Sequence, residues 1–227
     1  MSSIPRTIRK IVRGDQHYPA RLNDLFDPPS CLYIKGNIGL LLMPMVAIVG
    51  SRNASAKGLK NASHFAQSLS KAGGTIISGL AKGVDGAAHR ATLGLGANHH
   101  TLAVCGTGLD IAYPPEHQGL MTTIGHHGLL VSEFPPGVGP KAFHFPRRNR
   151  IIAALSLGVV VIEAAEKSGS LITARLACEL GREVFALPGS IDDPLFAGCH
   201  QLIQQGAKLV RSPQDVLEEL IFLKNPI

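Results

Sequence analysis

The chain has 227 residues, of which 45% are hydrophobic and 25 are glycine, so it can form one large domain with a sizeable core and many tight turns. Its 22 Lys and Arg residues outnumber 16 acidic residues, and the formal net charge of +6 is compatible with an anionic partner. No apolar run approaches the roughly 20 residues that cross a bilayer. The basic N-terminus lacks the apolar stretch of a signal peptide, so we expect a cytoplasmic protein.

The four cysteines do not form a recognisable framework. They are Cys31, Cys105, Cys178 and Cys199, scattered along the chain without CxxC spacing. This pattern is typical of buried apolar cysteines in a reducing compartment and speaks against disulfides or a zinc site. We expect neither a metal nor a cofactor.

Residues 1–44 are short pieces interrupted by proline, and we expect a lead-in segment packed on a domain formed by residues 45–227. From there, short apolar runs typical of buried parallel strands alternate with stretches typical of helices. The predicted strands are 45–50, 75–79, 101–106, 128–133, 158–164 and 183–189. The predicted helices lie within 59–74 and at 84–93, 116–126, 147–157, 170–180 and 212–223. The alternation predicts an α/β, doubly wound, mostly parallel sheet with helices on both faces.

Loops rich in Gly, Ser and Thr follow five of these strands. They read GSRNAS, SGLAKGVDGAAH, CGTGLDIAYP, SEFPPG and EAAEKSGSLITA. In such sheets ligands bind beyond the carboxyl ends of the strands, often at helix N-termini. Glycine in any one loop can simply permit a turn, but five such loops at one edge favour a ligand that carries phosphate.

Two common phosphate-binding motifs are absent after the first of these strands. A dinucleotide site requires G-x-G-x-x-G, and Arg52 stands where the second glycine would follow Gly50. A P-loop requires a second glycine at the position that Ser55 occupies. NAD, and ATP bound through a P-loop, are therefore not expected.

Asp85 and His89 lie four residues apart, on one face of a predicted helix. The pair could act as a base or bind a metal. Such pairs more often cap and support their own helix, and that is the interpretation we favour.

Cations and aromatic rings are concentrated in residues 141–150, where no Asp or Glu occurs. The cations are Lys141, Arg147, Arg148 and Arg150, and Phe143 and Phe145 flank a histidine. Cations that follow phosphates and rings that stack on unpaired bases suit a strand of nucleic acid. In the alternative interpretation Phe145 belongs to the core and the arginines form local salt bridges. Pro146 predicts that Phe145 stays in the loop before the helix.

Seven ordered motifs between about Ile11 and Leu220 resemble the bacterial DNA-processing protein A (DprA/Smf) family. They are VAIVGSRNASAKG, SGLAKGVDGAAHRATL, GTGLDIAYPPEH, SEFPPG, FHFPRRNRIIAALS, VVVIEAAEKSGSLITARLACELGREVFALPG and AGCHQLIQQGAKLV. The resemblance implies an extended Rossmann-like domain that binds single-stranded DNA and forms a homodimer. It also implies a non-enzymatic role, in which the protein protects incoming DNA during natural transformation and loads RecA recombinase onto it, including onto strands coated by single-strand-binding protein.

Many members of this family carry a helical domain before this region and a winged-helix domain after it, and we expect neither within these 227 residues. The resemblance implies that Arg52 and Lys141 bind phosphate and that Phe145 stacks on a base. We also expect Ser168, Gly169 and Ser170 to offer backbone donors at a helix N-terminus. The full predicted DNA-binding set is Gly50, Ser51, Arg52, Lys141, Phe145, Arg147, Arg148, Asn149, Arg150, Ser168, Gly169, Ser170 and Thr173.

The fold also resembles the lysine-decarboxylase-like nucleotide phosphoribohydrolases, whose P-G-G-x-G-T-x-x-E loop ends in a catalytic acid. The corresponding turn here is SGSLITARL, and Leu176 stands three residues after Thr173, where that chemistry requires a carboxylate. We therefore favour a DNA-binding mediator over an enzyme acting on a nucleotide phosphate. A sensor of a phosphorylated metabolite is a third alternative.

The C-terminal stretch is more apolar than an exposed last helix requires. Its apolar residues are Val216, Leu217, Leu220, Ile221, Phe222 and Leu223. The stretch could form part of a dimer interface, or it could dock on the chain's own sheet. The sequence leaves both possibilities open.

Overall fold

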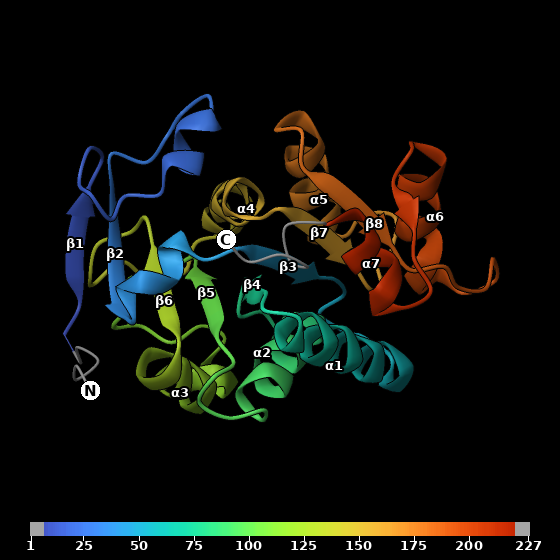
Figure 1. Ribbon diagram of the computed structural model, residues 1–227, viewed down its shortest axis with the longest axis horizontal. Coiled ribbons are helices and arrows are strands. Elements are labelled where there is room, and N and C mark those ends of the chain that lie inside the picture. Colours follow the sequence, from blue (N-terminus) through green and yellow to red (C-terminus); the bar gives the residue numbers. More distant parts are fainter. Residues whose placement is uncertain (1–6, 221–227) are drawn as a thin grey trace.

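A computed structural model describes residues 7–220 of the chain. All six predicted strands are present in it (Figure 1). They are β3 (Met45–Val49), β4 (Thr75–Ser78), β5 (Thr101–Cys105), β6 (Leu129–Ser132), β7 (Gly158–Val161) and β8 (Glu183–Ala186). The α/β, mostly parallel, doubly wound architecture is confirmed.

The predicted helices are also present. The α-helices are α1 (Ala56–Lys71), α2 (Val84–Leu93), α3 (Gln118–His127), α4 (His144–Leu155), α5 (Gly169–Glu179), α6 (Ala197–Gln204) and α7 (Pro213–Glu219). Short 3-10 helices lie at η1 (Ala20–Asp24), η2 (Ile38–Leu42), η3 (Pro115–His117) and η4 (Pro194–Phe196). Helix α6 was not predicted, and positions 221–223 of the last predicted helix lie outside the described residues. Within 7–220 no helix is long and apolar enough to span a membrane.

The lead-in segment contributes two strands that the sequence did not predict, β1 (Arg9–Val12) and β2 (Cys31–Gly36). Strand β2 pairs antiparallel with β6, with Tyr33 opposite Ser132, and β1 pairs antiparallel with β2. Leu22 and Leu32 are fully buried in the same core cluster as Met45 of β3. The described part of the lead-in is therefore continuous with the main sheet.

The strand order is β1-β2-β6-β5-β4-β3-β7-β8-β9, where β9 is the short strand Lys208–Leu209. The chain runs outward from β3 through β4, β5 and β6, and α4 then carries it back to β7 on the other side of β3. Strands β3 and β7 are parallel neighbours, with Val49 opposite Val161. Their carboxyl ends form the topological switch point, where ligands bind in sheets of this kind.

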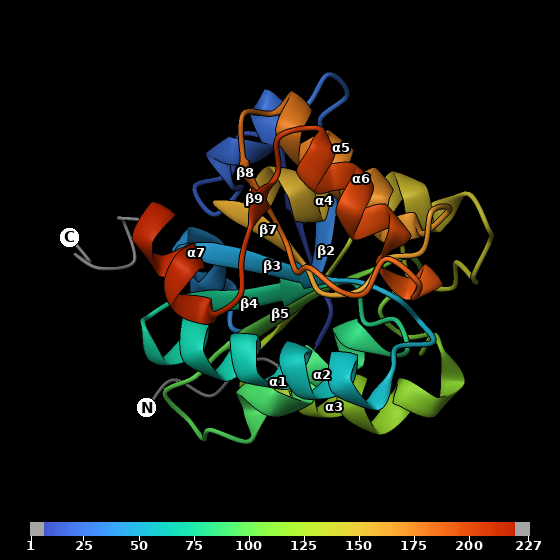
Figure 2. The ribbon, with the colours of Figure 1, turned by 90° about the vertical axis from the view of Figure 1, so that its right-hand side faces the viewer.

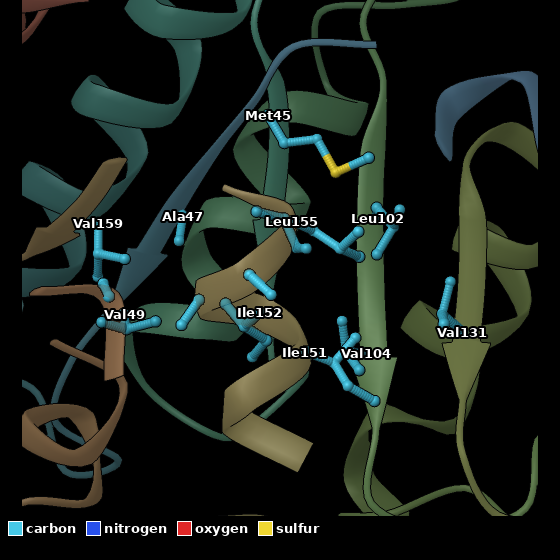
Figure 3. Packing of buried hydrophobic residues seen from close by; sticks show 14 of the residues in the cluster. Met45, Ala47, Val49, Leu102, Val104, Val131, Ile151, Ile152, Leu155 and Val159 are labelled. Carbon is cyan, nitrogen blue, oxygen red and sulfur yellow. The ribbon is translucent and has the colours of Figure 1, made fainter. Parts of the chain in front are cut away.

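Helices cover both faces of the sheet: α1, α2 and α3 pack on one face, and α4, α5 and α6 on the other (Figure 2). Side chains of β3 alternate accordingly. Ala47 and Val49 belong to the core cluster beneath α4, and Val46 and Ile48 belong to the cluster beneath α1. Figure 3 shows part of the first of these clusters, in which Ile152 of α4 lies between Val49 of β3 and Val104 of β5 in the view. Burial on both faces explains the continuous apolar strand sequences.

The expectation of four buried cysteines is correct for two of them. Cys105 and Cys199 are buried, and burial raises the pKa of each thiol to about 12. Cys31 is half-buried and Cys178 is exposed. Cys178 follows the buried Ala177 on α5 and so points away from the sheet.

Candidate nucleic-acid interface

A pocket of about 750 Å³ lies beyond the carboxyl ends of β3 and β7. The turn after β3, the start of α4 and the start of α5 form its walls. Eleven of the thirteen predicted site residues line it, namely Gly50, Ser51, Arg52, Lys141, Phe145, Arg148, Asn149, Ser168, Gly169, Ser170 and Thr173. Arg147 and Arg150 do not.

The turn from Gly50 to Arg52 is clamped between β7 and α2. Ser51 N–H donates to Glu163 O at 2.7 Å, and Ser51 O accepts from Val84 N–H at 3.2 Å. A Cβ atom at Gly50 would lie 2.7 Å from Val84 Cγ2 and 2.9 Å from Glu163 O, so only glycine fits this approach. The clamp fixes the backbone from which the exposed Arg52 side chain reaches into the pocket.

The loop after β7 ends at the N-terminus of α5, as predicted, but it offers fewer free donors than expected. Ser168 N–H donates to Ala165 O, and Ser170 N–H lies 3.4 Å from Ser168 Oγ, which caps the helix. Within the described chain Gly169 N–H has no protein acceptor and is exposed. Gly169 therefore supplies the donor that can meet an anion here, where the helix dipole favours negative charge.

The prediction that Pro146 keeps Phe145 out of the helix is wrong. Helix α4 begins at His144, so Phe145 and Pro146 both lie in its first turn. Proline fits there because the first N–H groups of a helix have no intrahelical acceptor. His144 Nδ1 lies 3.1 Å from Gly106 O and ties this turn to the end of β5.

Phe145 is half-buried in the pocket wall. The guanidinium carbon of Arg52 lies over its ring, 5.6 Å from the centroid. An aromatic ring and a cation thus meet in the pocket, although Arg52 and Phe145 are 93 positions apart in the chain.

Arg147 and Arg150 were predicted to follow phosphates, but they share an acid from outside their own motif, as in the alternative of local salt bridges. Arg147 Nε and Nη2 donate to Glu133 at 3.0 and 2.9 Å, and Arg150 Nη2 donates to the same carboxylate at 2.5 Å. Asp27 lies 3.7 Å from Arg147. Although burial raises the pKa of the Glu133 carboxyl, the two arginines outweigh it and hold that pKa below its ordinary value. These arginines fix α4 to the end of β6.

Arg148 reaches the pocket but is almost entirely buried beneath it. Its Nη1 donates to Gly79 O and Val104 O, the carbonyls at the ends of β4 and β5, and its Nε donates to Asn149 Oδ1 at 3.0 Å. Asp85 accepts from the N–H groups of Gly79 and Ala81 at 3.1 and 3.3 Å. Burial raises the pKa of Asp85 despite the charge of Arg148. Both side chains brace the pocket floor.

The Asp85 and His89 pair does not form a joint site. Asp85 binds the loop before α2, whereas His89 Nδ1 lies 2.6 Å from Thr101 Oγ1 on β5. His89 Nε2 is buried without a hydrogen-bond partner among the described residues. Burial, with the nearby charges of His117, Arg148 and Arg90, lowers the pKa of His89 to about 3. The expectation of a supporting role is correct, but the contacts extend beyond the pair's own helix.

The pocket residues that sequence reasoning missed include Lys167 and Tyr113, both of which can contact a ligand. Lys167 is exposed and directly precedes the predicted Ser168-Gly169-Ser170 turn, so its place in the sequence could have identified it. Tyr113 lies in the loop after β5, and only the fold brings it to the pocket. Among residues 7–220, Arg52, Lys141 and Lys167 form no salt bridge.

Comparison with known proteins identifies a family over most of the chain. Residues 9–221 match the model of the family described as DNA recombination-mediator protein A. The DNA processing protein DprA of Streptococcus pneumoniae is 53% identical over 208 residues, which cover 92% of this chain and 73% of that protein.

Two solved structures have the same fold as this chain. The crystal structure of DNA processing protein A from S. pneumoniae superposes with a TM-score of 0.89 at 51% identity, and covers 94% of this chain and 75% of that one. DNA processing protein A from Helicobacter pylori, whose structure is described in terms of its single-stranded DNA binding mode, superposes with a TM-score of 0.83 at 31% identity. That match covers 94% of this chain and 96% of the other. The chain therefore belongs to the DNA recombination-mediator protein A family.

Proposed function

We propose that this chain binds single-stranded DNA in the pocket at the switch point and acts there as a recombination mediator. One observation carries the proposal: Arg52, Lys141 and Lys167, which have no carboxylate partner within 7–220, line a pocket that also contains aromatic rings. Cations that neutralise phosphates and rings that stack on unpaired bases suit a single strand. The binding mode attributed to the H. pylori protein supports the same conclusion.

In the cell, the family resemblance implies the finer role: a cytoplasmic homodimer that protects incoming DNA during natural transformation and loads RecA recombinase onto it. The proposed role includes loading RecA onto strands that are coated with single-strand-binding protein. The ATPase activity of RecA on such coated strands measures this loading. We expect this chain to shorten the lag before RecA begins to hydrolyse ATP. A lag that stays unchanged at saturating protein contradicts the loading role while leaving DNA binding intact.

The contacts in the pocket also bear on the alternative of an enzyme acting on a nucleotide phosphate. Leu176, at the position where that chemistry requires a carboxylate, is a half-buried residue of α5 that packs against the apolar core. Asp85 is the carboxylate among the described pocket-lining residues, and its Oδ2 already accepts two backbone hydrogen bonds. Both observations support a binding role without catalysis.

Arg52→Ala tests the proposed site. Arg52 stands in a clamped turn and has no acidic partner within the described chain, so its guanidinium is available for a phosphate. We expect the substitution to weaken binding of a fluorescent oligo(dT) by about 1–3 kcal/mol in an anisotropy titration, as for a charge-assisted hydrogen bond.

Arg9→Ala is the matched control, because Arg9 is also an exposed arginine, lies on the edge strand β1 and does not line the pocket. It should bind like the wild type. If Arg52→Ala stays folded and binds with unchanged affinity, Arg52 does not belong to the site. A duplex competitor and a base-release assay on nucleoside monophosphates complete the design: duplex should compete poorly, and base release would favour the enzyme.

A further inference from the structure

Tyr113 is an exposed aromatic residue of the pocket. It lies in the loop after β5 and is 39% exposed. The loop is braced: Thr107 Oγ1 donates to Ile111 O at 2.9 Å, and the Asp110 carboxylate accepts from Gly137 N–H at 2.9 and 3.0 Å. Tyr113 is therefore presented to the pocket from a fixed backbone.

Tyr113 also packs on Phe145. The two ring centroids lie 5.1 Å apart, and the ring planes are inclined by 34°. Phe145 itself is surrounded: a Cβ built at Gly106 would lie 2.9 Å from its ring, and Arg52 lies over it. Of the two rings, Tyr113 thus leaves more surface open to a ligand, and Phe145 supports it.

We propose that Tyr113 stacks on a base of the bound strand, next to the phosphate contacts of Arg52. The inference rests on the proposed function and assigns a residue to it. A base has two π faces and can use an aromatic ring regardless of sequence, so the contact suits a site without base selectivity. The stacking surface is the ring and not its hydroxyl. Phenylalanine at position 113 should therefore preserve the affinity for DNA, whereas leucine or alanine should lower it.

The amino-acid composition gives a direct optical test. The chain contains no tryptophan and three tyrosines, Tyr18, Tyr33 and Tyr113. Tyr18 is 7% exposed, and its hydroxyl donates to Pro29 O. Tyr33 lies on β2 against a core cluster. Neither lines the pocket, so a base that stacks on Tyr113 should quench tyrosine emission through this residue.

The experiment titrates the full chain with oligo(dT) and records tyrosine emission, corrected for absorption by the oligonucleotide, beside anisotropy of a labelled strand. We expect the wild type to be quenched on binding. Tyr113→Phe should bind within twofold of the wild type and lose the quenching. Tyr113→Leu, which keeps an apolar side chain on Phe145, should bind roughly 5- to 150-fold more weakly with an unchanged salt dependence. Tyr33→Phe is the control and should keep both affinity and quenching.

Each other outcome is decisive. If Tyr113→Phe is quenched like the wild type, or if a folded Tyr113→Leu variant binds like the wild type, the assignment of Tyr113 is wrong while DNA binding stands. If Tyr113→Leu unfolds, the quenching difference between wild type and Tyr113→Phe still decides the matter. If the wild type shows no anisotropy change with oligo(dT), the proposed function fails and this inference fails with it.

Discussion

At the scale of single residues, the surroundings of each charge decide its role. Arg147 and Arg150 share the Glu133 carboxylate, and Arg148 is buried against two strand-end carbonyls. A strand of DNA would have to compete with these partners. Lys141 lies exposed, with its Nζ 6.0 Å from the Phe143 ring centroid and no carboxylate within the described residues. Lys141 can therefore bind a phosphate and release that phosphate's counterions without first breaking a salt bridge.

Lys141 and Phe145 should therefore contribute to DNA binding in different ways. We expect Lys141→Ala to lower the slope of log affinity against log salt by about 0.7, the value for one phosphate contact on a single strand. We expect Phe145→Leu to weaken single-strand binding by up to roughly 1–3 kcal/mol without changing that slope, because it removes the ring on which Tyr113 packs and no charge. Anisotropy titrations at several salt concentrations measure both quantities.

Leucine is chosen at Phe145 because it keeps apolar volume against Gly106, where the ring packs. Thermal unfolding identifies a variant whose binding falls only because the fold is lost. Identical changes in affinity and slope for the two variants would place Phe145 in the core and remove it from the DNA contacts.

His89 should make the fold sensitive to acid. Its pKa is lowered to about 3 in the folded protein from an ordinary 6.5. Between these values the unfolded chain binds a proton that the folded chain refuses, so stability falls as the pH falls through this window. From pH 7.5 to pH 5.0 this single group should cost about 2 kcal/mol of unfolding free energy. Urea denaturation at the two pH values measures the loss, and His89→Asn should reduce it by that amount.

The control for this prediction is His64→Asn, which removes an exposed histidine of α1. It should lose as much stability on acidification as the wild type does. The same pH dependence in the wild type and in His89→Asn would show that other groups carry the acid sensitivity.

At the scale of the elements, the N-terminus of α5 makes the sharpest prediction. Gly169 is the first residue of the helix, and Ser168 before it has an extended backbone with φ −69° and ψ 139°. Proline is favoured at the first position of a helix, and the residue before a proline is normally extended, as Ser168 is. Gly169 can therefore be replaced by proline without disturbing the backbone. Gly169→Pro removes the free N–H and should weaken oligonucleotide binding by about 1.5–3 kcal/mol, as for a hydrogen bond to a charged group. Gly169→Ala keeps the N–H and fills open space, so it should bind like the wild type.

A crystal grown with sulfate adds an independent measurement. We expect an anion at Gly169 N–H, within reach of Lys167, because the helix dipole and the lysine act together. Equal binding by Gly169→Pro and Gly169→Ala would show that this helix end does not contact phosphate.

At the scale of the whole molecule, the described part of the C-terminal stretch packs within the chain. Val216 and Leu220 are buried in the same core cluster as residues of α1, and Leu217 packs against it. Positions 221–223 lie outside the described residues. Of the two possibilities that the sequence left open, docking on the chain's own core holds for these three residues.

The homodimer remains a prediction from the family resemblance. Light scattering at micromolar concentration should give about twice the chain mass of 24.0 kDa. A mass equal to one chain contradicts the dimer without affecting DNA binding by the pocket, since every pocket residue described comes from a single chain.

The sequence by itself determined the class of fold and the edge of the sheet that holds the site. Six apolar runs predicted the parallel strands because burial on both faces requires continuous apolar sequence, which is a local signal. The Gly- and Ser-rich loops indicated the carboxyl edge because parallel strands all end there. Eleven of the thirteen predicted residues accordingly meet in one pocket. Strands β1 and β2 were missed because they are not continuous apolar runs: burial alternates along β2, which pairs with distant β6, and β1 is mostly exposed and pairs with β2.

Only the tertiary structure decided which charges remain free and which rings are accessible. Glu133 forms salt bridges with both Arg147 and Arg150 because the crossover from β6 to α4 brings it beside them, although the acid lies outside their motif. Phe145 lies in a helix although Pro146 follows it, since the first turn of a helix tolerates proline, and Tyr113 reaches Phe145 from the loop after another strand. Composition and spacing report which groups a segment carries. Coulomb interactions and packing act through space and depend on which segments the sheet topology makes neighbours.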